Sequence, residues 1–108
     1  MSTALITGAT SGIGRACALR CAALHYNLII TGRRAARLQE LTTQLMRDYQ
    51  IQVRPLCFDV ADQKQVADAF TQIKNTPDFL PIDVLINNAG NATALILFKM
   101  QTLPISRK

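Results

Sequence analysis

A glycine-rich turn between an apolar run and an amphipathic stretch constrains this chain more than any other feature. The turn spans Thr7–Gly14, reads TGATSGIG and directly follows the apolar residues Ala4–Ile6. Gly8 allows a tight exit from a strand, Gly12 lets backbone N–H groups approach a phosphate, and Gly14 lets a helix pack closely. The N-terminus of that helix presents partial positive charge. Glycines alone would indicate only a flexible loop, but between a strand and a helix they predict a dinucleotide-binding site.

Short apolar runs alternate with amphipathic stretches along the first 90 residues. Strands are expected at Ala4–Ile6, Leu28–Ile30, Val53–Phe58 and Val84–Ile86. Continuous apolar strands in repeated βα units are typical of a parallel sheet covered on both faces. Pro55 within the third strand indicates an edge position. The pattern therefore predicts an α/β fold, the N-terminal half of a doubly wound parallel-sheet (Rossmann) domain.

Three amphipathic helices are expected between these strands, from apolar residues that recur at spacings of three and four. The expected apolar faces are Ile13, Ala16, Cys17, Cys21 and Leu24 in the first helix, Leu38, Leu41, Leu45 and Tyr49 in the second, and Val66, Phe70 and Ile73 in the third. Asn27 is expected to end the first helix, since Asn tolerates the left-handed conformation. Asp62 is expected to cap the third.

The residues after the second strand bear on which dinucleotide is bound. An NAD site places an acidic residue about 20 positions beyond the glycines, where it bonds the ribose 2′-hydroxyl. Arg33 lies 19 positions after Gly14, Arg34 follows it, and no Asp or Glu occurs between Arg15 and Gln39. A guanidinium offers a planar fork to a 2′-phosphate. The alternative is a pair of solvated arginines, although positive charge at a helix start opposes the helix dipole. The pattern favours NADP over NAD.

Four motifs in this order resemble the short-chain dehydrogenase/reductase family over about residues 3–92. They are Thr7–Gly14, Thr31-Gly32-Arg33-Arg34, Asp59-Val60 and Asn87-Asn88-Ala89-Gly90. The arginine pair followed by Arg37-Leu38 and Glu40-Leu41 is similar to the NADP-preferring branch that oxidises serine and 3-hydroxy acids.

The resemblance implies roles for residues that spacing alone does not assign. It implies that Asp59 bonds the adenine amino group with Val60 beside it, and that Asn88, Ala89 and Gly90 line the adenine ribose. From the residues alone, Asp59 follows an apolar strand and so is expected at the carboxyl edge of the sheet, where ligands bind; the alternative is a turn or helix-capping residue. Spacing alone predicts only a turn after a strand for the Asn-rich motif. The predicted cofactor-binding residues are Gly8, Thr10, Ser11, Gly12, Ile13, Gly14, Arg33, Arg34, Asp59, Val60, Asn88, Ala89 and Gly90.

No catalytic residue and no metal ligand is predicted. The resemblance implies catalysis by a Tyr and a Lys four residues apart, but Tyr26 is followed at that distance by Ile30 and Tyr49 by Val53. These 108 residues alone are therefore expected to show no turnover. Cys17 and Cys21 lie one helical turn apart, yet no second pair accompanies them, which favours helix packing over metal binding.

The last residues depart from the family pattern. We expect a partial NAD(P)-binding Rossmann domain over residues 1–92, truncated after the fourth strand, and a divergent tail over residues 93–108. Without a fifth strand the outer edge of the fourth strand would lie open, so the isolated chain would be marginally stable and prone to associate. The alternative is a natural short product in which the run Leu95–Phe98 covers the edge of the sheet.

Charge and composition argue against several classes of partner and location for this chain. The net charge is +5, but residues 1–90 hold nine basic and seven acidic side chains. Aromatic and basic residues are not interleaved, which argues against nucleic-acid binding. The longest apolar run, Ala92–Phe98, contains a Thr and is far shorter than the roughly 18 residues of a membrane helix. No basic residue precedes the first apolar run, which argues against a signal peptide. Three cysteines favour a reducing cytoplasm.

The sequence thus predicts the cofactor-binding half of an oxidoreductase that passes a hydride between NADP and a small hydroxyl or carbonyl substrate. The expected partners are NADP(H) and, in the intact enzyme, that substrate; the resemblance also implies homo-oligomers. The alternative is a non-catalytic dinucleotide-binding or interaction module from a truncated or frameshifted gene.

Overall fold

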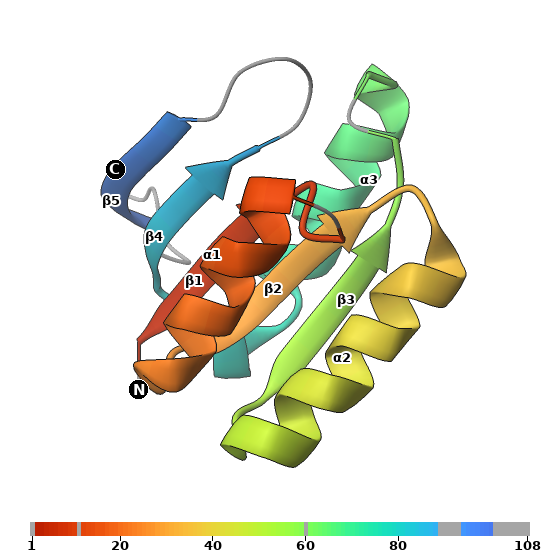
Figure 1. The fold of residues 1–108 in the computed structure, drawn as a ribbon. Helices are drawn as coiled ribbons and strands as arrows, with labels where there is room; N and C mark the ends of the chain where they lie inside the picture. Colours follow the sequence, from red (N-terminus) through yellow and green to blue (C-terminus); the bar gives the residue numbers. More distant parts are fainter. Residues whose placement is uncertain (1, 11, 60, 89–93, 101–108) are drawn as a thin grey trace.

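The computed structural model describes residues 2–10, 12–59 and 61–88, and the backbone of 94–100. One five-stranded sheet has the order β3-β2-β1-β4-β5 (Figure 1). Its strands are β1 (Thr3–Thr7), β2 (Asn27–Gly32), β3 (Val53–Cys57), β4 (Ile82–Asn87) and β5 (Ala94–Met100). Strands β1 to β4 pair in parallel. The predicted doubly wound α/β sheet is confirmed.

Helices cover both faces of the sheet. Helices α1 (Gly12–Ala23) and α2 (Ala35–Tyr49) lie on the near face in Figure 1, and α3 (Gln63–Lys74) lies on the far face. A 3₁₀ turn, η1 (Pro77–Phe79), joins α3 to β4. Successive side chains of a strand point to opposite faces, so Ile6 packs with α1 and α2 while Leu5 packs on the α3 side. No helix in the described ranges is long and apolar enough to cross a membrane.

The buried face of α1 differs from the expected one. Its buried residues are Gly14, Ala18, Cys21 and Ala22, whereas Ile13 and Leu24 are 60% and 58% exposed. The prediction from apolar periodicity is therefore confirmed at Cys21 and wrong at Ile13, Ala16 and Leu24. The physical reason is close approach, because α1 begins against the backbone of the preceding turn and only small residues fit between helix and sheet.

The other two helices follow the sequence more closely. Leu38, Leu41 and Leu45 of α2 are buried as predicted. Asp62 caps α3 as predicted, and one of its carboxylate oxygens accepts from the backbone N–H groups of Lys64 and Gln65 at 3.0 and 3.3 Å. The expected apolar stripe of α3 is wrong at one position, since Phe70 is 44% exposed and α3 turns the smaller Ala69 toward the sheet.

The end of α1 also differs from the prediction. His25, with a φ of 65°, takes the left-handed conformation expected of Asn27. Asn27 instead begins β2, is buried, and its side-chain oxygen accepts from the backbone N–H of Gln52 at 3.1 Å. This bond connects the start of β2 to the residue before β3, so Asn27 is part of the sheet. The left-handed residue that ends the helical segment is therefore His25.

The edge position of β3 is confirmed, since among the described strands β2 alone pairs with it. Phe58 donates its backbone N–H to the carbonyl of Gly32 at 3.0 Å. Successive residues of a strand direct their backbone N–H groups to opposite sides. Pro55 lies three positions before Phe58, so its nitrogen faces the open side, away from β2. The missing N–H of the proline therefore removes no hydrogen bond from the ladder.

The outer edge of β4 is not open, which corrects the expectation of an unpaired fourth strand. Strand β5 pairs with it antiparallel, with Ile86 opposite Leu95 and Ile82 opposite Met100. The expectation that the run Leu95–Phe98 covers the edge of the sheet is confirmed. The physical reason is that an apolar strand beside an unpaired parallel strand satisfies its N–H and C=O groups in either direction.

Candidate functional site

The order of the strands reverses around β1. Strands β2 and β3 lie on one side of β1 and β4 lies on the other. In doubly wound sheets, ligands bind in the crevice beyond the carboxyl ends of the strands at such a reversal. The glycine-rich turn follows β1 and Asn88 follows β4, and a hydrogen bond from Asn88 to Gly8 brings two of the four motifs together at this point.

The backbone of the turn takes conformations that glycine permits. Gly8 and Gly12 have φ angles of 62° and 59°, which L side chains rarely adopt. A Cβ added at Gly12 would meet no heavy atom within 4 Å. The start of α1 therefore borders open space, and the first backbone N–H groups of a helix have no partner within it.

Gly14 is required for a different reason, which is close approach. A Cβ at this position would collide with the carbonyl oxygen of Gly8 and would lie 2.5 Å from the side-chain nitrogen of Asn88. The lack of a side chain lets α1 start directly against the turn and against the end of β4.

Hydrogen bonds join the ends of β1 and β4. The side-chain nitrogen of Asn88 donates to the carbonyl of Gly8 at 3.1 Å, and its backbone N–H donates to the hydroxyl of Thr7 at 3.0 Å. The Thr7 hydroxyl donates in turn to the side-chain oxygen of Asn87 at 2.8 Å. Asn88 thus holds the turn in place.

Thr7 and Asn87 were not among the predicted site residues. Each is the last residue of its strand, and β1 and β4 are neighbours in the sheet. A signal was present in the sequence, because neighbouring parallel strands bring the polar residues at their carboxyl ends together.

The turn is also fixed against the end of β2. The backbone N–H of Ala9 donates to the carbonyl of Thr31 at 2.9 Å. A Cβ at Gly32 would lie 3.0 Å from the methyl carbon of Thr10, so Thr10 lies directly beside Gly32. Arg33 and Arg34 follow Gly32 and are exposed. The structure therefore brings the glycine-rich turn and the arginine pair together.

The positive charge at the start of α2 is not compensated locally. Arg34 is the N-cap residue of α2 and makes no side-chain capping bond, and the first turn of the helix contains no acidic residue. The ion pair in the described ranges joins Arg47 and Asp48, far along α2. Since the N-terminus of a helix already bears partial positive charge, this corner of the molecule suits an anionic group such as a phosphate.

Asp59 follows β3, on the far side of β2 from the glycine-rich turn. One of its carboxylate oxygens accepts from the backbone N–H of Ala61 at 2.9 Å, and its own backbone N–H donates to the side-chain oxygen of Gln65 at 2.9 Å. The residue therefore forms a turn, as one of the two interpretations of the sequence held. The predicted site residues Ser11, Val60, Ala89 and Gly90 lie outside the described residues.

No metal site is formed by the residues that the structure describes, since no three His, Cys, Asp or Glu side chains gather there. Cys17, Cys21 and Cys57 are free thiols. Burial raises the pKa of the Cys21 thiol, and the nearby Cys17 raises it further. The thiol of Cys57, at the end of β3, lies 3.6 Å from the carbonyl oxygen of Arg33.

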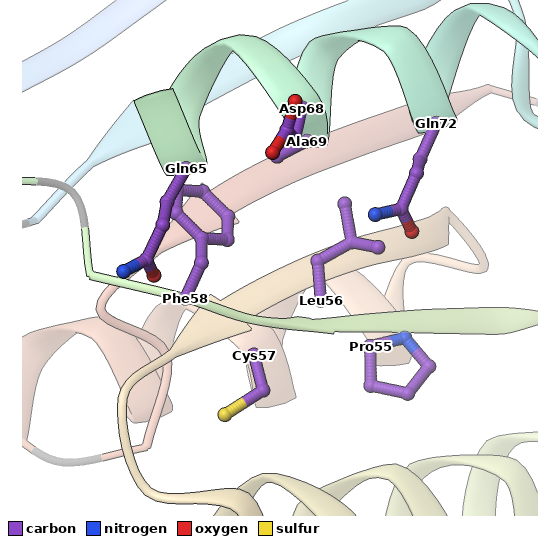
Figure 2. Close-up of a pocket in the computed structure, with 8 residues that line it drawn as sticks. All are labelled: Pro55, Leu56, Cys57, Phe58, Gln65, Asp68, Ala69 and Gln72. Carbon is purple, nitrogen blue, oxygen red and sulfur yellow. The ribbon is translucent and has the colours of Figure 1, made fainter. Parts of the chain in front are cut away.

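A pocket of about 280 Å³ lies between β3 and α3, away from the crevice (Figure 2). It is lined by Pro55, Leu56, Cys57, Phe58, Gln65, Asp68, Ala69 and Gln72. Leu56 and Phe58 point toward α3, whereas Pro55 and Cys57 point to the other face of the sheet (Figure 2). The pocket contains none of the predicted site residues.

Comparison with known proteins adds three kinds of match. The sequence model of a family described as short chain dehydrogenase matches residues 2–103. Sulfoacetaldehyde reductase 2 of Chromohalobacter salexigens is 43% identical over 90 residues, which cover 83% of this chain and 34% of that protein. The NADP-dependent 3-hydroxy acid dehydrogenase of Schizosaccharomyces pombe is 41% identical over 91 residues, with coverage of 83% and 34%.

Among solved structures, a short-chain dehydrogenase from Sphingobium yanoikuyae in complex with NADPH matches with a TM-score of 0.75 and 34% identity. The match covers 85% of this chain and 35% of that chain. This chain therefore spans about a third of the length of the proteins it matches. The resemblance indicated by the four sequence motifs is confirmed.

Proposed function

This chain belongs to the short chain dehydrogenase family, and on that premise we propose that it binds NADP(H) at the crevice beyond β1 and β4. In the proposed role it is the cofactor-binding part of an oxidoreductase. The cofactor supplies the hydride chemistry when bound, while the residues of this chain bind and orient it.

One observation is central to the proposal: the glycine-rich turn and the uncompensated arginines meet at the end of β2. The open space at Gly12 gives a pyrophosphate access to the N-terminus of α1. Arg33 and Arg34 stand where a 2′-phosphate would extend from the adenine ribose, and guanidinium groups bind phosphate in a bidentate manner. The relative from Schizosaccharomyces pombe is named as NADP-dependent, and the Sphingobium structure contains NADPH.

The other proposed contacts are more peripheral. Asp59 would bond the adenine amino group beside Val60, and Ala89 and Gly90 would line the adenine ribose. Asn88 would act on the cofactor through the turn that it holds, since its amide is bonded to Gly8. Thr10, Ser11 and Ile13 would complete the wall at the start of α1.

The substrate of the whole protein is proposed as a small molecule with a hydroxyl or carbonyl group. Three free cysteines support a reducing compartment such as the cytoplasm. A dinucleotide-binding module without turnover is the second candidate. It is favoured by one observation on these 108 residues, that neither Tyr26 nor Tyr49 is followed by Lys four positions later.

The test of cofactor choice is a charge exchange at the arginine pair. Wild type is expected to bind NADPH at least about tenfold more tightly than NADH, because charged hydrogen bonds contribute about 1.5–3 kcal/mol each. The double substitution Arg33→Asp and Arg34→Ala should abolish that preference in calorimetric titrations of the full chain. Arg20→Ala, at an exposed position near the other end of α1, is the matched control and should retain it. Equal affinities for both cofactors in wild type would refute the proposal.

A further inference from the structure

A second hollow lies between the start of α1 and the N-terminal half of α2, next to the glycine-rich turn. Its volume is about 350 Å³, and it is lined by Thr10, Arg15, Arg37, Glu40, Leu41 and Gln44. Thr10 belongs to the turn and lies beside Gly32, the residue before Arg33. Through Thr10, one wall of the hollow therefore lies beside Gly32, the residue that precedes the arginine pair.

Two arginines line this hollow, and they differ in how they are held. The guanidinium of Arg15 donates to the side-chain oxygen of Gln44 at 3.1 Å, which ties α1 to α2. Arg37 forms no hydrogen bond through its side chain and no ion pair within the described ranges. Its charge is thus available at the wall of the hollow.

Arg37 lies on the same side of α2 as Arg34, a member of the arginine pair. Arg34 is the N-cap of α2, and residues three apart lie on the same side of a helix. Arg37 therefore stands one turn below Arg34 on one side of α2. Positive charge in the first turn opposes the helix dipole, so this placement destabilises the helix unless an anion is bound nearby.

Glu40 gives the hollow a charge of the opposite sign. It lines the same space as Arg37, one helical turn further along α2, and the two side chains form no ion pair in the described structure. A carboxylate at this position repels a bound phosphate, whereas the guanidinium attracts it. Substitutions of the two residues should therefore act on an anionic ligand with opposite sign.

We propose that Arg37, at the wall of this hollow, is a further specificity-determining residue that contacts the 2′-phosphate of NADP(H), and that Glu40 limits the strength of that contact. The inference rests on the proposed function and deepens it. It adds to Arg33 and Arg34 a third cation, which reaches the phosphate from the side of the hollow. The hydrogen bond from Arg15 to Gln44 fixes the side of the hollow that α1 forms.

The test compares NADPH and NADH binding to the full chain by calorimetric titration. Arg37→Gln should weaken NADPH binding about five- to tenfold, the effect of one charged hydrogen bond in an open pocket, and leave NADH binding within about twofold. Glu40→Gln should tighten NADPH binding about two- to threefold, because it removes a repelling charge. Arg37→Lys should restore part of the lost affinity, since it keeps the charge without the planar fork.

The matched control is Arg47→Gln, which removes one positive charge from the far end of the same helix, where Arg47 pairs with Asp48. It should change neither affinity, and all variants should keep the circular dichroism spectrum of wild type. If wild type prefers NADPH but Arg37→Gln keeps the ratio of the NADH and NADPH dissociation constants within twofold of the wild-type ratio, this inference is wrong and the proposed function stands. If wild type shows no preference for NADPH, both are wrong.

Discussion

The hydrophobic cores on the two faces of the sheet differ in size. On the face of α1 and α2, the core extends from Ile6 and Ile30 to Leu38, Leu41 and Leu45 of α2. On the other face, the core formed by residues of described burial is smaller and includes Ala69 and Ile73 of α3 with Phe79 of η1. Leu85 and Phe58 are only half-buried there, and Phe70 of α3 is 44% exposed.

The difference shows where this sequence concentrates its packing. The glycine-rich turn, the arginine pair and the hollow beside Thr10 all adjoin the first face, whose helices fix the positions of these groups. The α3 face contributes Asp59 and the Asp62 cap but contains fewer large buried side chains. We therefore expect the stability of the proposed cofactor site to depend mainly on α1 and α2.

The largest effect is expected from Gly14→Ala on the first face. The added Cβ would collide with the Gly8 carbonyl and approach the Asn88 amide, so α1 must move away from the turn. We expect a loss of about 2–4 kcal/mol in the free energy of unfolding, at the upper end of overpacking effects, together with loss of NADPH binding. Urea unfolding measures the first and calorimetry the second.

The matched control is Gly12→Ala, where a Cβ meets nothing but the φ of 59° remains unfavourable. It should cost about 1–2 kcal/mol. If Gly14→Ala is no more destabilising than Gly12→Ala, the close contact between α1 and the turn is not what fixes the site.

The next effect compares one residue from each face. Leu45 of α2 is fully buried, so Leu45→Ala should reduce the free energy of unfolding by about 3 kcal/mol. Phe70 of α3 is 44% exposed, so Phe70→Ala should cost about 1 kcal/mol or less because much of the ring already contacts water. Both are measured by urea unfolding at one temperature. Equal losses would contradict the difference between the two faces.

A smaller effect is expected at the cap of α3. Asp62→Ala removes the acceptor of the Lys64 and Gln65 backbone N–H groups and should cost about 1 kcal/mol. Hydrogen exchange should increase in the first turn of α3 and remain unchanged in α1 and α2. Asp62→Asn, which retains a capping oxygen, is the control and should stay close to wild type. Faster exchange throughout the molecule would show that the two faces do not open separately.

The smallest effect concerns the buried thiol of the first face. Burial raises the folded-state pKa of Cys21 above its ordinary value of 9.0. At pH 7 the thiol is neutral in both states, so the shift has no effect there. Above pH 9 the unfolded thiol ionises first, and stability is lost as the pH rises toward the folded-state pKa. Relative to Cys21→Ala, wild type should lose stability over this range in urea unfolding; a constant difference from pH 7 to 10 would contradict the buried position.

Local signals predicted much of this fold. The strand–turn–helix pattern at Thr7–Gly14, the edge position of Pro55 and the Asp62 cap each depend on neighbouring residues and the geometry of one element. The buried face of α1 could be predicted only at Cys21 from apolar periodicity, because the close contact at Gly14 decides which side faces the sheet. The exposure of Phe70 likewise depends on what packs against α3.

The parts of the site that sequence reasoning missed depend on distant pairs. Thr7 and Asn87 are 80 positions apart and meet only because β1 and β4 are neighbours. The hollow containing Arg37 forms only once α1 and α2 lie side by side. The pairing of β5 with β4 is long-range in the same sense, since an apolar run does not reveal the strand or the direction with which it pairs.

The most direct test of the central claim is a titration of the isotopically labelled full chain with NADPH, followed by two-dimensional amide NMR. We predict that the largest shift changes fall on Gly8, Gly12, Gly14 and the residues Gly32–Arg34, and that the amides of α3 beyond its first turn change little. Shift changes centred on the pocket between β3 and α3, or none at millimolar NADPH, would contradict the placement of the cofactor at the crevice beyond β1 and β4.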